Sequence, residues 1–169
     1  QAEGFYLGRL GKGNAPAGAA NAKPAKPPTP DKNSGAECPN GLHCNFVPAA
    51  YAQNSADPGD YGNYDLANRP ADGLAVRFVV VHDTEESYED TLATFENSHN
   101  YVSAHYVTRS SDGFVTQMVQ TKNVAWQAGN WWINTHSVGI ENEGFALDPS
   151  YFTKDLYHSL ARLTRYTAN

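Results

Sequence analysis

The fold of this chain is set by residues 76–85, which read Val-Arg-Phe-Val-Val-Val-His-Asp-Thr-Glu. A near-continuous run of β-branched and aromatic residues predicts a strand that is buried on both faces of a sheet. The run ends in four consecutive polar residues, so several reactive groups arrive together at the end of one strand. Functional residues often lie at strand ends because the strand fixes the backbone while the following loop stays accessible. We therefore expect a functional site around His82.

The size and charge of the chain narrow the possible classes of protein. Its 169 residues suffice for one domain with a sizeable core and are too few for two comfortable ones. A formal net charge of −6 argues against general nucleic-acid binding, which depends on clustered Lys and Arg. No apolar run approaches the roughly 18 residues that span a bilayer. We expect a soluble protein without a membrane span, whose export signal was removed or never present, because no charged and apolar leader follows Gln1.

Two cysteines, Cys38 and Cys44, flank a Pro-Asn-Gly turn. A pair this close suits a small disulfide loop better than a zinc knuckle, which would need further Cys or His ligands at short spacing. His43 beside Cys44 leaves metal binding as the competing interpretation. A disulfide places a protein outside a reducing cytosol, so we predict a secreted, extracellular protein.

Composition divides the chain into three regions. Residues 1–45 predict a flexible tail rich in Pro, Ala and Lys, because much of this region lacks the apolar surface needed to offset chain entropy. Residues 46–73 are also loop-like, but their tyrosines predict an irregular segment that wraps around the domain. The compact domain is expected to occupy residues 74–169.

Beyond the first strand, the apolar pattern changes to a helical period. Apolar residues recur at helical spacing after Ser87, which is of an N-cap type, and predict a helix ending near Ser98. Residues 103–108 and 114–120 are two strand-like runs, and the intervening Asp112-Gly113 is a strong hairpin turn signal. We therefore predict an antiparallel pair after the first helix.

The last part of the chain predicts a second strand and a second helix. Residues 137–142, Ser-Val-Gly-Ile-Glu-Asn, read as a buried strand, and leucines from Leu156 onward form a helical stripe. The order strand, helix, hairpin, strand, helix predicts a mixed α/β fold, with a central mixed β-sheet flanked by helices and a long irregular N-terminal extension. Such a sheet places His82 and Glu141 on two strands whose ends can meet.

Three side chains are candidates for chemistry. Glu141 lies among apolar residues, where a carboxyl group has a raised pKa that suits a general base acting on metal-activated water; an ion pair with an arginine is the alternative. His82 could ligate a metal, although a strand-end histidine is more often structural. His105 could face the same cleft, although core packing is the safer assumption. No two histidines have the spacing of a helical zinc site, so metal ligands would come from separate elements.

Residues 125–132, Ala-Trp-Gln-Ala-Gly-Asn-Trp-Trp, show neither helical nor strand periodicity. Three indoles near two amides offer flat surfaces together with hydrogen bonds, a combination that suits sugar rings or peptide planes. The alternative is that some of these tryptophans fill the core. The candidate substrate-binding residues are Thr84, His105, Trp126, Asn130 and Trp131.

Five short motifs follow one another within residues 74–169. They are Val-Val-Val-His-Asp-Thr at 79–84, Val-Ser-Ala-His-Tyr-Val at 102–107, Asp-Gly at 112–113, Ala-Trp-Gln-Ala-Gly-Asn-Trp at 125–131 and Ser-Val-Gly-Ile-Glu-Asn-Glu-Gly at 137–144. In this order the motifs resemble the type 2 N-acetylmuramoyl-L-alanine amidase family, which includes the peptidoglycan recognition proteins. Each motif alone is weak, whereas the five together are specific.

The resemblance implies a zinc enzyme that cleaves the amide between N-acetylmuramic acid and L-alanine of peptidoglycan at the cell wall. His82 matches the family's first zinc ligand. Glu141 matches an acidic residue that takes a proton from water and passes it to the leaving amine. Residues 126–132 would line the groove for the glycan and the stem peptide. A non-catalytic peptidoglycan-binding module on the same fold is the alternative.

Three features depart from the family pattern. Ala104 stands where several relatives carry Tyr, and Gln127 stands where relatives often carry His. The family's second zinc histidine and third ligand lie beyond the last helix, whereas this sequence stops at Asn169. Because catalytic zinc takes three protein ligands, we expect a second fragment of the same polypeptide to supply the others. We expect this chain alone to be inactive.

Overall fold

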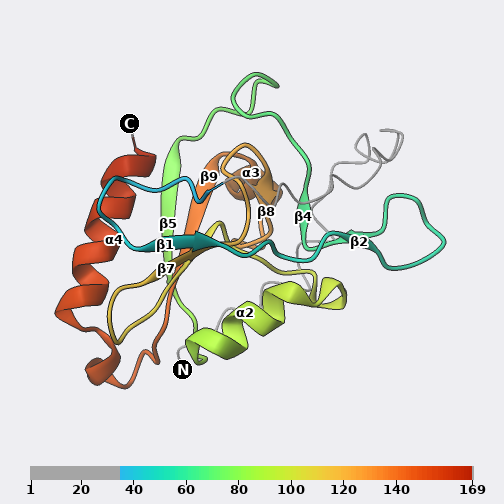
Figure 1. The fold of residues 1–169 in the computed structure, drawn as a ribbon. Coiled ribbons are helices and arrows are strands. Elements are labelled where there is room, and N and C mark those ends of the chain that lie inside the picture. The colour runs from blue at the N-terminus through green and yellow to red at the C-terminus, as the bar shows by residue number, and fades with distance from the viewer. Residues whose placement is uncertain (1–34, 169) are drawn as a thin grey trace.

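The central sheet of the protein is mixed and has five strands. We describe a computed structural model in which residues 35–168 are placed (Figure 1), so most of the predicted tail, residues 1–34, lies outside the described residues. Among residues 35–168, no helix is long and apolar enough to cross a membrane. In spatial order, the strands of the sheet are β1 (Cys44–Phe46), β7 (Val115–Gln117), β6 (Tyr106–Thr108), β9 (Ser137–Asn142) and β5 (Phe78–Asp83).

The strand directions and the helices confirm the predicted mixed α/β class. Strands β5, β9 and β6 run parallel, β6 and β7 form the predicted antiparallel pair, and β1 runs parallel to β7. Helix α2 begins after the predicted N-cap Ser87, whose side chain accepts a hydrogen bond from the Asp90 N–H. The helices are α2 (Tyr88–Glu96), α3 (Trp131–Thr135) and α4 (Lys154–Thr167), with the 3-10 turns η3 (Ser98–Asn100) and η4 (Pro149–Tyr151).

Two hydrophobic clusters lie on opposite faces of the sheet. Neighbouring residues of β6 point to opposite faces, and Val107 packs with the apolar side of α2 while Tyr106 packs with Leu163 of α4. Ile140 on β9 belongs to the α4 cluster, so its neighbour Glu141 points to the other face. We call the face that carries Glu141 the site face.

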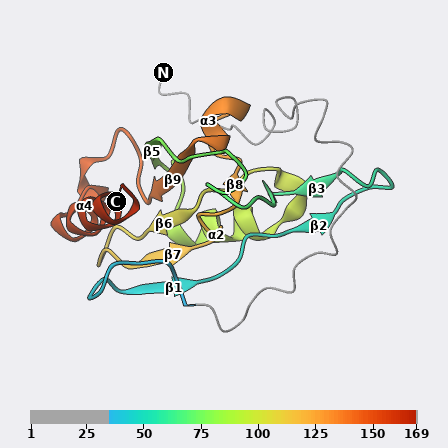
Figure 2. The ribbon, with the colours of Figure 1, turned by 90° about the horizontal axis from the view of Figure 1, so that it is seen from above.

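Strand β5 lies at the edge of the sheet, and the prediction that it is buried on both faces was wrong. It pairs with β9 on one side only, and Figure 2 shows β5 and β1 at opposite edges. Helix α2 packs over β6, and helix α4 packs over β6 and β9, so that much of β5 is left uncovered. Val81 is 51% exposed and Phe78 is 43% exposed. The apolar run specified a strand, but the neighbouring elements determined how far it is buried.

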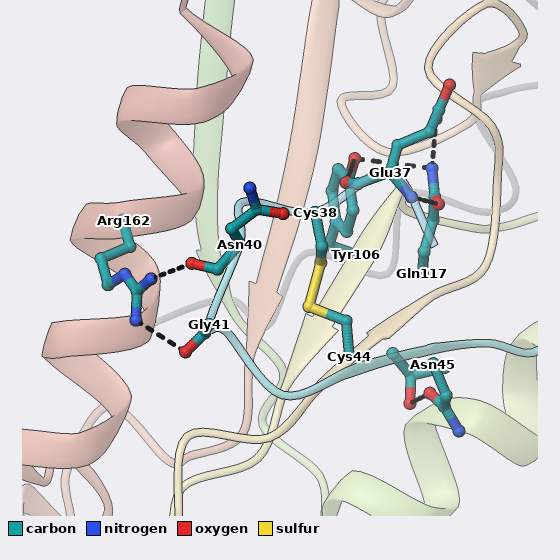
Figure 3. Close-up of a disulfide and its surroundings, with 10 residues drawn as sticks. Glu37, Cys38, Asn40, Gly41, Cys44, Asn45, Tyr106, Gln117 and Arg162 are labelled. Atoms are coloured by element: carbon teal, nitrogen blue, oxygen red, sulfur yellow. Dashed lines mark hydrogen bonds between the residues drawn. A yellow bond between two sulfur atoms is a disulfide. The ribbon is translucent and has the colours of Figure 1, made fainter. Parts of the chain in front are cut away.

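Residues 35–45 are part of the folded unit, although the tail was expected to extend to residue 45. The predicted disulfide joins Cys38 to Cys44 (Figure 3), so neither thiol is left for the competing metal site. Both cysteines pack against the α4 cluster. Arg162 of α4 donates hydrogen bonds to the carbonyl oxygens of Gly41 and Asn40, at 2.9 and 2.5 Å. The disulfide loop is thereby attached to α4.

Residues 46–73 contribute little regular structure. Their tyrosine rings pack together, with the ring centroid of Tyr51 4.8 Å from Tyr61 and 5.0 Å from Tyr64. This region contains three short strands, β2 (Ala52–Gln53), β3 (Tyr61–Gly62) and β4 (Tyr64–Asp65). Strand β2 pairs with β3, and β4 pairs with β8 (Val124–Ala125) from later in the chain.

Candidate functional site

His82 and Glu141 lie directly opposite each other on neighbouring strands. The parallel register of β5 and β9 pairs His82 with Glu141, and paired residues of a sheet point to the same face. Both side chains therefore point to the site face. The sheet brings together two residues that are far apart in the sequence, as expected from the order of elements.

Burial determines the chemistry of Glu141. Its Oε2 atom is buried and has no hydrogen-bond partner in the part of the chain that the structure describes. Burial raises the pKa of Glu141 to about 8, and the nearby carboxylates of Asp83 and Glu86 act in the same direction. The alternative of an ion pair with arginine finds no partner for Glu141 among residues 35–168. A carboxyl group with such a pKa can both accept and release a proton near neutral pH.

The ring of His82 is held by Gln127. The Nε2 atom of His82 lies 2.5 Å from Oε1 of Gln127, and Nδ1 has no hydrogen bond to the described residues. Burial lowers the pKa of His82, while the contact with Gln127 and the charge of Asp83 oppose this effect. A neutral imidazole is the form that ligates metals.

The described residues provide one histidine ligand and a neighbouring carboxyl group for a zinc site. His82 has a ring nitrogen without a partner, and Glu141 has an unpaired buried oxygen on the neighbouring strand. However, within residues 35–168 no three His, Cys, Asp or Glu side chains lie close enough to hold a metal ion. His82 is therefore the one ligand of the expected set that the described residues offer, and a catalytic zinc ion takes three.

His105 is an interior residue, which corrects its prediction as a substrate-binding residue. Its side chain is 0% exposed, and its Nδ1 accepts a hydrogen bond from the Gly139 N–H at 3.1 Å. Its Nε2 lies 2.9 Å from Arg69 and 3.2 Å from the Asn123 carbonyl oxygen. Burial, assisted by the charge of Arg69, lowers the pKa of His105 to about 3. Core packing, the alternative interpretation, describes this side chain.

The other predicted substrate-binding residues are more accessible or lie at the margin of the core. Trp126 is largely buried and donates from Nε1 to a carboxylate oxygen of Asp65 at 2.5 Å. Asn130 is exposed and caps α3, a helix too short to produce a periodic pattern in the sequence. Trp131 is half-buried as the first residue of α3. Thr84 donates from its hydroxyl group to the Glu86 carbonyl oxygen at 2.7 Å.

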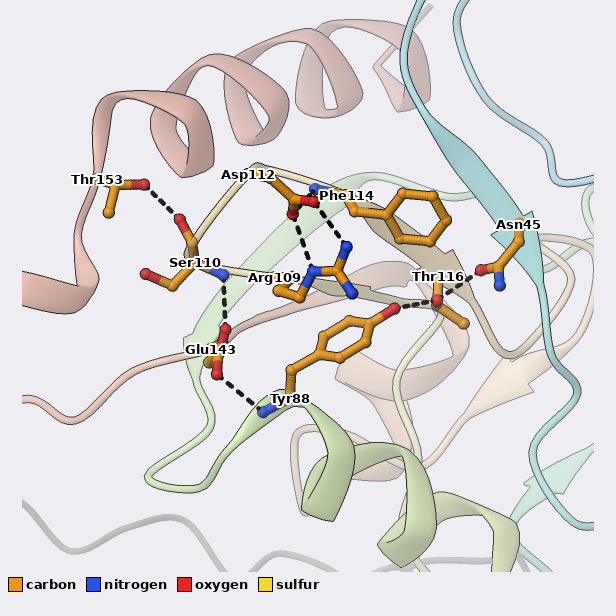
Figure 4. A network of polar contacts seen from close by, with 9 residues as sticks. All are labelled: Asn45, Tyr88, Arg109, Ser110, Asp112, Phe114, Thr116, Glu143 and Thr153. Carbon is orange, nitrogen blue, oxygen red and sulfur yellow. Dashed lines mark hydrogen bonds and ion pairs between the residues drawn. The ribbon is translucent and has the colours of Figure 1, made fainter.

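Glu143 connects three elements at the carboxyl edge of the sheet, and sequence reasoning did not identify it. Its carboxylate accepts hydrogen bonds from the backbone N–H groups of Tyr88, at 3.2 Å, and Ser110, at 2.7 Å (Figure 4). Thr153 then donates to the Ser110 carbonyl oxygen at 2.5 Å. The start of α2, the end of β6 and the N-cap of α4 are thus joined just beyond Glu141. A carboxylate two residues after Glu141 was the available signal.

An open cavity of about 580 Å³ lies beside this network. Three carboxylates face it, those of Glu89, Glu143 and Asp148, together with the guanidinium group of Arg109. Arg109 is already paired with Asp112 at 2.6 Å. The cavity therefore carries more acidic than basic side chains, and it lies at the same edge of the sheet as the His82 and Glu141 pair.

Comparisons with known proteins show which families and structures this chain is similar to. A family model described as N-acetylmuramoyl-L-alanine amidase matches residues 72–169. N-acetylmuramoyl-L-alanine amidase A of Achromobacter lyticus is 36% identical over 109 residues, which are 64% of this chain and 58% of that protein. The Staphylococcus aureus hydrolase AmiA gives a TM-score of 0.49 at 15% identity, covering 77% of this chain and 58% of the other. The PlyG catalytic domain gives 0.45 at 19% identity, covering 70% and 62%. The chain thus spans less than two thirds of the length of each.

Proposed function

Because the chain belongs to the N-acetylmuramoyl-L-alanine amidase family, we propose that it takes part in hydrolysing the amide between N-acetylmuramic acid and L-alanine of peptidoglycan. The observation that carries the proposal is the pairing of His82 with Glu141 across β5 and β9. Metal-assisted amide hydrolysis needs a nitrogen ligand beside a group that moves protons, and this pair supplies both.

Glu141 is the proposed general base. Its unpaired Oε2 accepts a proton from the attacking water, and its raised pKa lets it return that proton to the departing amine nitrogen of alanine. His82 would hold a zinc ion, which when bound supplies Lewis-acid polarisation of the scissile carbonyl and lowers the pKa of water to about 7. The carbon–nitrogen bond breaks as the amine receives its proton.

The remaining zinc ligands are proposed to come from a further part of the same polypeptide. Residues 35–168 contain no group of three donors, so a complete site needs ligands from elsewhere. The open edge of β5, with Phe78 and Val81 exposed and Val76 exposed just before the strand, is a surface on which further chain can pack. Native proteins usually cover or blunt such an apolar edge, which supports this arrangement.

Substrate contacts are proposed for the segment around α3 and for Thr84. Asn130 and Trp131 are at least partly exposed, whereas Trp126, a few residues earlier in the sequence, is largely buried. Flat indole surfaces and an amide suit the sugar rings and peptide planes of a muramyl peptide. The disulfide supports action outside the cell, where peptidoglycan is found.

The decisive experiment replaces the proposed base. In the complete native polypeptide, Glu141→Gln is expected to reduce the release of alanine amino termini from purified peptidoglycan by about 10²- to 10⁴-fold. Binding of a soluble muramyl peptide should be kept, because the amide occupies the same space. Glu96→Gln, a matched change at an exposed position of α2, should leave both quantities unchanged. Retained turnover in Glu141→Gln would refute the general-base role.

Zinc binding tests the incomplete ligand set separately. Residues 1–169 alone are expected to bind zinc weakly and to leave peptidoglycan intact, because one histidine does not make a tight site. The complete polypeptide is expected to bind one zinc ion and to lose it after His82→Ala. Metal content of dialysed protein measures both. Tight, stoichiometric zinc in residues 1–169 would contradict the need for outside ligands.

A non-catalytic peptidoglycan-binding module is the second candidate. The lack of a three-donor group among residues 35–168 favours it, since binding needs no metal. The two candidates differ in the wild-type complete polypeptide. Muramyl-peptide binding without any release of alanine amino termini, with zinc present, identifies a binding module, whereas turnover identifies the enzyme.

A further inference from the structure

A chain of three hydrogen bonds leads from His82 into the core. Nε2 of His82 lies 2.5 Å from Oε1 of Gln127. The amide nitrogen of Gln127 donates to Oγ of Ser137 at 2.6 Å, and Oγ of Ser137 donates to the Ile133 carbonyl oxygen at 2.7 Å. The first hydrogen bond starts from the edge strand β5, and the chain passes through the buried side chains of Gln127 and Ser137.

The last link determines the direction of the other two. A carbonyl oxygen only accepts, so the single hydroxyl proton of Ser137 is used on Ile133. The Ser137 oxygen must then accept from Gln127, which places the amide nitrogen on the Ser137 side. The amide oxygen of Gln127 therefore faces His82. Because that oxygen can only accept, Nε2 of His82 must carry a proton.

Packing holds Gln127 in this orientation. Its side chain is 2% exposed and lies directly on Gly139 of β9. A Cβ atom at position 139 would stand 2.7 Å from Cγ and 2.8 Å from Cδ of Gln127, closer than real contacts allow. The backbone N–H of Gln127 donates to Oδ1 of Asn134 at 3.3 Å. Glycine at this position thus leaves the space that Gln127 fills.

We propose that Gln127 is a positioning residue, which fixes the ring of His82 with its proton on Nε2 and its lone pair on Nδ1. The consequence for metal binding rests on the proposed function: Nδ1 is the atom offered to the metal, and the ring is already oriented before the metal arrives. Partners behind a ligating histidine commonly set its tautomer and orientation in this way. Gln127 stands where relatives often carry histidine, and in this chain its role is to orient the ring of His82.

The proton on His82 can be observed directly. Nitrogen-15 NMR of the metal-free chain should show His82 protonated at Nε2 with slow solvent exchange, assigned by its absence in His82→Gln. Gln127→Leu removes the acceptor and should speed exchange of this proton at least about tenfold. Gln127→Glu keeps an acceptor and should preserve slow exchange. Gln53→Leu, the same change at an exposed position, is the matched control.

A second variant keeps the test valid if Gln127→Leu does not fold, which circular dichroism reveals. Ser137→Ala removes the group that orients the amide, so Gln127 can turn and exchange of the His82 proton should also accelerate. A wild-type ring protonated at Nδ1 instead of Nε2 would overturn the positioning role. Unchanged exchange in the folded Gln127 or Ser137 variants would overturn it as well.

Zinc affinity of the complete polypeptide separates this inference from the proposed function. Gln127→Leu should weaken zinc binding about 10- to 100-fold, whereas Gln127→Glu should bind nearly as tightly as wild type. If zinc binds and Gln127→Leu leaves the affinity unchanged, the positioning role is wrong. If no variant binds zinc while the NMR result stands, the proposed zinc function fails and the role of Gln127 in holding His82 remains.

Discussion

Strands β5 and β9 look alike in sequence and lie side by side, yet their surroundings differ. Each has six residues, includes β-branched residues and carries one member of the proposed site, His82 or Glu141. Strand β9 is paired on both sides and almost entirely buried, whereas β5 is paired on one side and alternates between partly buried and exposed residues. The difference shows that an apolar run specifies a strand without specifying its place in the sheet.

The contrast has a chemical consequence. The interior position of β9 gives Glu141 a raised pKa, because a buried carboxylate loses its hydration. The edge position of β5 leaves one ring nitrogen of His82 without a partner among the described residues. The buried environment of β9 thus makes Glu141 a proton acceptor, and the edge environment of β5 leaves His82 able to act as a ligand.

The largest expected effect tests the burial of Glu141 through pH. Its pKa is raised from 4.5 to about 8, so between these values the folded protein holds a proton that the unfolded chain has lost. The stability contributed by this group is complete below pH 4.5 and is lost as the pH rises through 8. The loss should be on the order of 5 kcal/mol.

Urea unfolding of wild type and Glu141→Gln between pH 4 and 9 measures this effect. The stability difference between the two proteins cancels the contributions of other groups, including the buried His105, whose lowered pKa acts in the opposite direction. Wild type should lose stability relative to Glu141→Gln as the pH rises. A difference independent of pH would mean that Glu141 is well solvated.

The next effect compares one substitution on the two strands. Val138 on β9 is 2% exposed and belongs to the α4 cluster, whereas Val81 on β5 is 51% exposed. Val138→Ala should cost about 2 to 3 kcal/mol because it leaves a cavity, and Val81→Ala should change stability by less than about 0.5 kcal/mol. Unfolding in urea gives both values. Equal costs would show that the β5 edge is covered in solution.

The smallest expected effect concerns the opposite edge of the sheet. Strand β1 is an edge strand like β5, but the Cys38–Cys44 loop precedes it and bonds to Arg162 of α4. Replacing both cysteines by serine should cost about 2 kcal/mol, the loop-closure entropy of so short a ring. Reductant should bring wild type to the same unfolding midpoint. If reductant also lowered the unfolding midpoint of the double variant, the effect of reductant on wild type would not come from the Cys38–Cys44 disulfide alone.

Several features of the fold were predictable because their signals are local. The N-cap Ser87, the turn at Asp112-Gly113 and the strand over residues 137–142 each depend on a few adjacent residues. The disulfide followed from the closeness of its two cysteines. Motif order then identified the family that the comparison confirmed.

Other features escaped prediction for physical reasons. Helix α3 spans five residues, which is less than two turns and produces no period. Strand β1 pairs with β7, whose residues lie far away along the chain, so no local pattern announces the pairing. His105 stayed a substrate-binding candidate beside core packing because alternation along a strand distinguishes two faces without showing which one is covered.

The sequence was sufficient to predict strands β5, β6, β7 and β9, the helices α2 and α4 and the disulfide, and to nominate His82 and Glu141 as the centre of the proposed site. Only the tertiary structure decided that β5 is an edge strand, that His105 is internal, and that Gln127 lies between His82 and Ser137. The reason is physical. Propensity and periodicity depend on neighbours along the chain, whereas burial, pKa values and hydrogen-bond direction depend on groups that folding brings together from distant positions.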